Sequence, residues 1–138
     1  MKKVRDVMTR DMHVAAPDQT IAAAAKEMAE ADIGCLPVGD NDRLIGMVTD
    51  RDMVVRAIAQ GKDSQTPIRE VMTESIKYCF DDEDVEDVAR NMAELGVRRL
   101  PVVNRDKRLV GFVALSNIAQ GGNSSSKETL LRGVATPH

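Results

Sequence analysis

The sequence has almost no aromatic residues: one Tyr, two Phe and no Trp, or 2% of 138 residues. A core without large rings must be filled by Val, Ile, Leu, Met and Ala. No segment approaches the roughly 20 consecutive apolar residues that a membrane-spanning helix needs. The charged N-terminus is not followed by the apolar run of a signal peptide. The sequence therefore predicts no membrane partner.

An excess of positive charge is also missing, because 19 Lys and Arg stand against 22 Asp and Glu, for a formal net charge of -3. Nucleic-acid binding requires a basic footprint that neutralises phosphates, so we expect no nucleic-acid partner. Cys35 and Cys79 are too few for a disulfide framework and lack the spacing of metal ligands. We expect two reduced thiols in a cytoplasmic protein.

What the chain does contain is an internal repeat of about sixty residues. The matching segments, first 64 and then 65 positions apart, are Val7-Met8-Thr9 with Val71-Met72-Thr73, Leu36-Pro37-Val38 with Leu100-Pro101-Val102, and Leu44-Ile45-Gly46 with Leu109-Val110-Gly111. The extra residue falls in the polar turn before the third pair, where insertions are tolerated.

The repeat divides the chain into four parts: residues 1–61, a polar linker 62–67, residues 68–121, and a Gly/Ser-rich flexible tail 122–138. Each repeat is too small to bury an adequate core alone, so the two should pack together as one module. In the tail, Ser125 and Glu128 could form a capping box for a short helix around Lys127 to Arg132.

Each repeat predicts the order strand, helix, strand, strand, helix, an α+β arrangement. We expect Thr20 and Asp84 to cap the first helix of the two repeats. The apolar face of each helix follows the 3.6-residue period. The face residues are Ile21, Ala24, Ala25 and Met28 in the first repeat, and Val85, Val88, Ala89 and Met92 in the second. Asn and Asp supply turn chemistry between the later strands, which begin at Leu36 and Leu44, or at Leu100 and Leu109.

The doubled unit carries Leu-Pro-Val in its middle, and the first copy ends in Gly46-Met47-Val48-Thr49-Asp50-Arg51-Asp52-Met53. It resembles the CBS domain pair, or Bateman module, over residues 4–121. The resemblance implies a pseudo-twofold module with clefts between the repeats for an adenosyl ligand. AMP, ADP or ATP is the expected regulatory ligand, with S-adenosylmethionine and NAD(H) as further candidates. It also implies a homodimer, and leaves any protein target unidentified.

In the family pattern, Thr49 and Asp52 contact ribose or phosphate, and Asp50 and Arg51 lie between them. A carboxylate can accept two hydrogen bonds from a vicinal diol, and such charge-assisted bonds are strong. Free backbone N–H groups at a helix start favour a phosphate. The alternative is that Thr49 and Asp52 form only a capping box, which stabilises the helix by about 1 kcal/mol. The two roles can coexist.

The second repeat departs from this pattern, with Ala114 in place of the threonine and Asn117 in place of the aspartate. Ser116 is expected to cap the final helix instead. We therefore expect one competent site and one degenerate site. Arg98 and Arg99 are candidates for binding phosphate through their planar donor forks, with solvated surface arginines as the alternative.

The residues expected to line the base pocket are Met12, His13, Cys35 and Pro37. The acidic residues around Asp40 and Asp42 have the chemistry of a tight turn rather than of a calcium loop, so no metal site is expected. Catalytic groupings do not stand out, and the chain is expected not to be an enzyme. It is predicted to be a regulatory sensor; the alternative is a constitutive dimerisation or interaction module with vestigial clefts.

Overall fold

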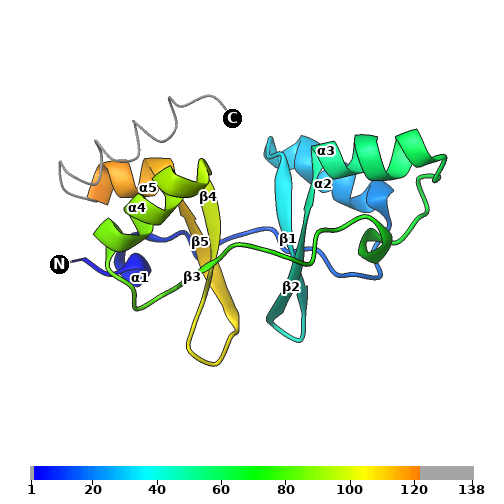
Figure 1. Ribbon diagram of the computed structural model, residues 1–138. Coiled ribbons are helices and arrows are strands. Elements are labelled where there is room, and N and C mark those ends of the chain that lie inside the picture. The colour runs from blue at the N-terminus through cyan, green and yellow to red at the C-terminus, as the bar shows by residue number, and fades with distance from the viewer. Residues whose placement is uncertain (1, 122–138) are drawn as a thin grey trace. The chain divides into compact units, whose positions relative to one another are not determined.

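The computed structural model describes residues 2–121, and the chain falls into two compact units. We call residues 13–76 the continuous unit, and residues 2–12 together with 77–121 the split unit. Each combines helices with a small sheet (Figure 1), so the expected α+β class is confirmed. The capping box of Ser125 and Glu128 and the helix expected near residues 127–132 lie outside the described residues.

The sheet of the continuous unit is an antiparallel hairpin of β1 (Cys35–Asp40) and β2 (Arg43–Thr49). The two turn residues, Asn41 and Asp42, have φ of 52° and 65°. Two-residue hairpin turns of type I′ require this left-handed conformation at both central positions, and Asn and Asp tolerate it. The polar turn predicted from the sequence is confirmed.

The split unit has a three-stranded sheet. β3 (Cys79–Phe80) runs parallel to β4 (Arg99–Val103), which pairs antiparallel with β5 (Leu109–Ala114). In the continuous unit the first strand of the repeat is reduced to one parallel bridge between Ala15 and Val38. The predicted strand before the first helix is therefore present in the split unit, whereas in the continuous unit a single bridge takes its place.

The helix α2 (Ile21–Ala31) begins as predicted, because the Thr20 hydroxyl oxygen accepts a hydrogen bond of 3.1 Å from the N–H three residues on. Its buried residues are Ile21, Ala24 and Met28. Ala25, which was expected on the same face, is exposed at the edge of that face.

The helix α4 (Val85–Leu95) buries all four predicted face residues. Asp84 stands at its N-cap position, but its side chain makes no capping bond. Its carboxylate instead lies 2.7 Å from the Lys3 ammonium, which attracts it more strongly than a neutral backbone N–H does. The expected side-chain cap is therefore wrong at Asp84.

The remaining helical segments are α1 (Val4–Val7), α3 (Asp50–Asp52), the π-helix η1 (Met53–Ala57), the 3₁₀ turns η2 (Ile58–Gln60) and η3 (Ile68–Glu70), and α5 (Leu115–Gly121).

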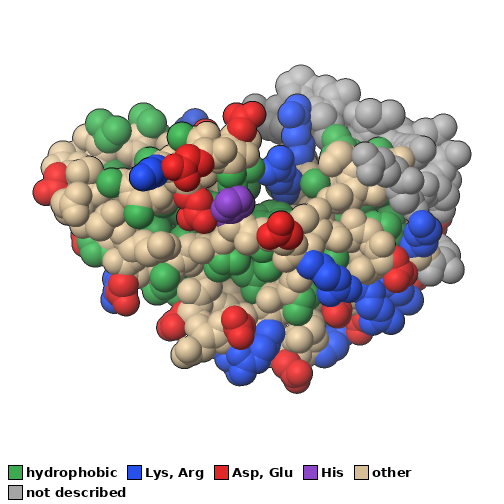
Figure 2. Space-filling model, turned by 180° about the vertical axis from the view of Figure 1, so that it is seen from behind, with side chains coloured by type: hydrophobic (Ala, Val, Ile, Leu, Met, Phe, Trp, Pro, Cys, Tyr) green, Lys and Arg blue, Asp and Glu red, His purple; other side chains and the backbone are tan. Residues whose placement is uncertain are grey.

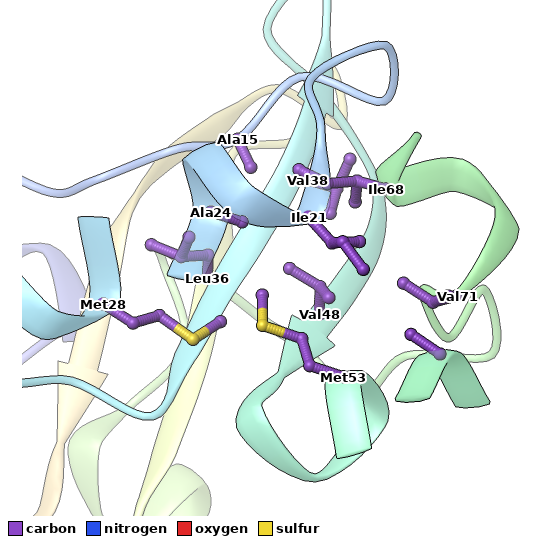
Figure 3. Close-up of a cluster of buried hydrophobic side chains, with 11 residues drawn as sticks. Ala15, Ile21, Ala24, Met28, Leu36, Val38, Val48, Met53, Ile68 and Val71 are labelled. Carbon is purple, nitrogen blue, oxygen red and sulfur yellow. The ribbon is translucent and has the colours of Figure 1, made fainter. Parts of the chain in front are cut away.

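The hydrophobic cores show that the two repeats exchange their leading segments. Ile68 and Val71, from the start of the second repeat, are fully buried in the core of the continuous unit (Figure 3). Val4, from the start of the first repeat, is fully buried in the core of the split unit. The compact units are therefore divided differently from the sequence repeats, at residues 12 and 76.

Backbone hydrogen bonds hold each exchanged segment in place. In the continuous unit, Met47 of β2 and Thr73 exchange two bonds of 2.9 and 2.8 Å. In the split unit, Thr9 and Phe112 of β5 exchange two bonds of 2.7 and 2.9 Å. The repeated Val-Met-Thr motif is thus the segment that pairs with the second strand of each hairpin.

None of the helices in residues 2–121 is long and apolar enough to cross a membrane. Acidic and basic side chains are interspersed with hydrophobic ones over the described part of the face in Figure 2.

Candidate functional site

The candidate site lies where β2 ends and α3 begins. Thr49 has an extended backbone, with φ -123° and ψ 163°, and forms the N-cap of α3. Its hydroxyl oxygen accepts a 3.0 Å bond from the Asp52 N–H, and Asp52 Oδ2 accepts a 3.0 Å bond from the Thr49 N–H. The two residues therefore form a reciprocal capping box, which fixes both side chains at the start of the helix.

The capping box leaves binding capacity on both side chains. A hydroxyl has one donor and two acceptor positions, and the bond from Asp52 occupies one acceptor position of Thr49, so the O–H can still donate. The second carboxylate oxygen of Asp52, Oδ1, lies 3.7 Å from Nε of Arg56. Only 13% of the Asp52 side chain is exposed, which positions a carboxylate with little freedom to move.

Asp50 and Arg51 occupy the first turn of α3, and both are exposed. Asp50 Oδ1 accepts a 2.8 Å bond from the Arg51 N–H, while the Asp50 N–H donates to the Gly34 carbonyl at 3.0 Å. A Cβ on Gly34 would lie 3.1 Å from Asp50 Oδ2. The small residue at position 34 therefore leaves space for this carboxylate at the edge of the junction.

The equivalent junction in the split unit keeps half of this arrangement. Asn117 Oδ1 accepts a 2.8 Å bond from the Ala114 N–H, but Ala114 has no hydroxyl to complete the box. The Asn117 amide nitrogen also lies 3.4 Å from the Thr9 hydroxyl oxygen. Ser116, expected to cap this helix, is its second residue, since α5 begins at Leu115; that expectation is wrong.

Arg98 and Arg99 are exposed and lie beside this second junction. Arg99 pairs with Ala114 across β4 and β5, and the Arg98 carbonyl accepts a 2.8 Å bond from the Leu115 N–H. In the split unit, the backbones of two exposed arginines therefore adjoin the junction that lacks the acid.

The residues expected around a base have different surroundings. Cys35 is half-buried and lies opposite Thr49 in the hairpin, so these two are neighbours across the strands. Pro37 is buried within β1, and His13 is exposed with Nδ1 3.1 Å from Glu27 Oε1. Met12 is half-buried and belongs to the split unit, whereas the other three belong to the continuous unit.

Arg56, which is not among the predicted site residues, also lies at this junction. Besides its approach to Asp52, its Nη1 donates a 3.2 Å bond to the Met72 carbonyl. The sequence signal that could have found the ion pair is the spacing of four residues between an acid and a base on one helix. Among the described residues, no group of three or more His, Cys, Asp or Glu side chains is placed to hold a metal ion.

The family model for the CBS domain matches twice, over residues 4–58 and 68–121. The chain belongs to the CBS domain family. The two matches coincide with the repeats found in the sequence, so the resemblance is confirmed. This CBS-pair chain is 40% identical over 132 residues to the CBS domain-containing protein YhcV of Bacillus subtilis, covering 94% of each chain. It is also 40% identical over 139 residues to hypoxic response protein 1 of Mycobacterium tuberculosis, covering 99% of this chain and 96% of that one.

Solved CBS structures resemble the chain over most of its length. The crystal structure of hypoxic response protein I with two coordinated zinc ions has a TM-score of 0.77, with 88% of this chain and 99% of that one covered. CBSX2 in complex with AMP has a TM-score of 0.75 at 30% identity, with coverages of 86% and 94%. The CBS domain pair of protein MJ0100, in complex with 5′-methylthioadenosine and S-adenosyl-L-methionine, has a TM-score of 0.71 at 30% identity and the same coverages.

Proposed function

We propose that this CBS-pair protein is a regulatory module that binds an adenosyl nucleotide at the β2–α3 junction. The observation that carries the proposal is the capping box, which fixes Thr49 and Asp52 while leaving a hydroxyl donor and a carboxylate acceptor to bind a ligand. Two CBS structures at 30% identity contain AMP, or methylthioadenosine and S-adenosylmethionine, which supports this ligand class.

In the proposed complex the ribose diol bonds to Asp52, and Thr49 donates to a ribose or phosphate oxygen. The side chains of Asp50 and Arg51 add polar contacts at the helix start, whereas the N–H groups of both residues are already bonded within the protein. The base is assigned to the neighbourhood of Cys35 and Pro37 along β1, with His13 as a further contact; the role of Met12 stays a prediction. AMP, ADP and ATP are the preferred candidates over S-adenosylmethionine and NAD(H).

We assign phosphate binding to Arg98 and Arg99. Both are exposed, and a guanidinium binds phosphate through two parallel N–H donors. Beside them Ala114 and Asn117 supply no negative charge, so an anion near β4 and β5 meets no repulsion from the junction itself. The two junctions therefore differ in charge: the junction of the continuous unit is acidic, and the strand beside the junction of the split unit is basic.

The proposed mechanism is regulatory, and the chain is assigned no catalytic step. A ligand that binds one conformation more tightly shifts the population toward it, and this changes what the protein contacts. We propose a homodimer, supported by the exposed apolar side chains of Val54, Val55 and Ile58 on the consecutive helical segments η1 and η2. Two cysteines present as thiols favour a reducing cytoplasmic location.

A thermal-shift panel of AMP, ADP, ATP, S-adenosylmethionine, NADH and GTP tests the function. A ligand that binds only the folded protein raises the melting temperature, by an amount that grows with its concentration. We expect a shift with an adenine nucleotide, and a much smaller shift in the variant Asp52→Asn, which keeps an oxygen for the cap but loses the charge. No shift at millimolar concentration with any compound would favour the alternative, a constitutive interaction module with vestigial sites; the altered second junction lends that alternative some weight.

A further inference from the structure

Arg56 connects the candidate site to the segment through which the chain leaves the continuous unit. Its guanidinium lies 3.7 Å from Asp52 Oδ1 through Nε and donates a 3.2 Å bond to the Met72 carbonyl through Nη1. One side chain thus contacts both the carboxylate of the junction and the exchanged segment. The planar fork of arginine makes such a double contact possible, because its N–H groups point in fixed directions.

The segment that Arg56 contacts is fitted closely against β2. Met47 and Thr73 exchange two backbone bonds, and a Cβ on Gly46 would lie 2.9 Å from Met72 Sδ. Five residues after Met72, at Lys77, the chain enters the split unit. The segment that Arg56 contacts is therefore the last part of the continuous unit before the chain enters the split unit.

The split unit makes a comparable connection by a different route. There the Asn117 side chain lies 3.4 Å from the hydroxyl of Thr9, in the segment that pairs with β5. In both units, the side chain at the fourth position of the junction is linked to the exchanged Val-Met-Thr segment. In the continuous unit this link runs through a charged side chain, the guanidinium of Arg56, which lies beside the Asp52 carboxylate.

We propose that Arg56 is a positioning residue that couples occupancy of the Thr49–Asp52 junction to the segment 71–73. A diol that donates to Asp52 Oδ1 competes with the guanidinium for this carboxylate oxygen, whereas a phosphate near the helix start competes with the carboxylate for the guanidinium. The hold of Arg56 on the Met72 carbonyl then weakens, and the Met47–Thr73 pair opens more often. The ligand-driven part of this coupling rests on the proposed nucleotide site, whereas the link between Asp52, Arg56 and Met72 does not.

Amide hydrogen exchange measured by NMR tests the link without any ligand. The reporters are the N–H groups of Met47 and Thr73, and the internal control is the equivalent pair of Thr9 and Phe112 in the split unit. Arg56→Met should speed exchange of the reporters about three- to tenfold and leave the control pair unchanged. This range is the effect expected from the loss of one partly exposed, charge-assisted hydrogen bond. Asp52→Asn should act in the same direction.

The double variant decides whether the two residues act through one another. If they do, Asp52→Asn with Arg56→Met exchanges no faster than Arg56→Met alone, because the link is already broken. Arg43→Met removes an exposed charge elsewhere on β2 and should leave the reporters unchanged. Unchanged reporters in Arg56→Met, or additive effects in the double variant, would overturn the proposal.

Saturating AMP completes the test. In the wild-type protein AMP should speed exchange of the two reporters relative to the other amides of β1 and β2. In Arg56→Met, AMP should still raise the melting temperature but cause no further change at the reporters. An identical response in both proteins would refute the coupling. If AMP does not bind, AMP is ruled out as the ligand of the proposed site. Hydrogen exchange in the ligand-free double variant still tests the role of Arg56.

Discussion

Gly46 lies so close to Met72 that a Cβ at position 46 would stand 2.9 Å from the Met72 sulfur and 3.0 Å from the Thr73 carbonyl oxygen. The split unit repeats this contact more tightly, since a Cβ on Gly111 would stand 2.7 Å from the Thr9 carbonyl oxygen and 2.9 Å from Met8 Sδ. Each glycine therefore gives the exchanged segment room to approach the strand.

Replacing these glycines by alanine should destabilise the protein unequally. Gly111→Ala forces a Cβ against a backbone oxygen that is itself held in a two-bond pair, and should cost about 1–3 kcal/mol of unfolding free energy. Gly46→Ala should cost less, because its nearest backbone atom, the Thr73 carbonyl oxygen, would lie at 3.0 Å rather than 2.7 Å, and its other close neighbour is a methionine side chain that can rotate away. Urea unfolding of both variants measures the difference. Equal losses, or a larger loss at position 46, would contradict the packing described here.

Much of this architecture follows from the sequence because local chemistry decides it. The turn at Asn41 and Asp42, the cap at Thr20 and the capping box at Thr49 all depend on residues within four positions of one another. In each of them, hydrogen bonding over a short stretch of chain selects one conformation, and the structure agrees with the prediction.

The exchange of the leading segments was not predictable in the same way. Val7-Met8-Thr9 and Val71-Met72-Thr73 have the same sequence, and this identity does not say which sheet each one joins. Asp84 is a second feature that local sequence does not decide. Its position just before a helix favours an N-cap, but its carboxylate bonds to Lys3, which is 81 positions away in the sequence. Contacts between residues distant in the chain decide these features, and no local pattern encodes them.

The two junctions should differ in nucleotide affinity. Asp52→Ala removes a charged acceptor, and a hydrogen bond to a charged group corresponds to about tenfold or more in affinity. Asn117→Ala removes a neutral amide already bonded to the Ala114 N–H, and should change AMP affinity less. Isothermal titration calorimetry at a temperature where both variants are folded measures the ratio. Equal weakening by the two substitutions would argue against one competent junction.

Arg98 and Arg99 should distinguish ligands by their phosphates. The double variant Arg98→Ala, Arg99→Ala should weaken ATP binding strongly and leave adenosine binding almost unchanged, because only ATP supplies the anion. Raising the salt concentration should reduce the wild-type preference for ATP in the same direction, through screening of exposed charges. Equal losses for ATP and adenosine would rule out a phosphate role.

The proposed homodimer should depend on the apolar face of η1 and η2. Ile58 is 70% exposed and Val54 is 57% exposed, and burial of both in an interface would remove apolar surface from water. Ile58→Asp should therefore convert a dimer to a monomer in light scattering coupled to size exclusion. Leu95→Asp, at an exposed leucine on α4, is the matched control and should leave the mass unchanged. A wild-type monomer, or a dimer unaffected by Ile58→Asp, would contradict this interface.

The Cys79 thiol should not react with thiol reagents while the protein is folded. Burial, with the nearby carboxylates of Glu83 and Asp81, raises the pKa of its thiol from 9.0 to about 12, so the reactive thiolate is scarce at pH 8. In the variant Cys35→Ser, which leaves Cys79 as the one thiol, a thiol reagent should react only as fast as the protein unfolds. Because the unfolded thiol loses its proton near pH 9 and the folded one does not, Cys79 also lowers stability as pH rises from about 9 to 12. Cys79→Ala should show a shallower alkaline loss in urea unfolding. Rapid labelling of the folded protein would refute the buried, protonated thiol.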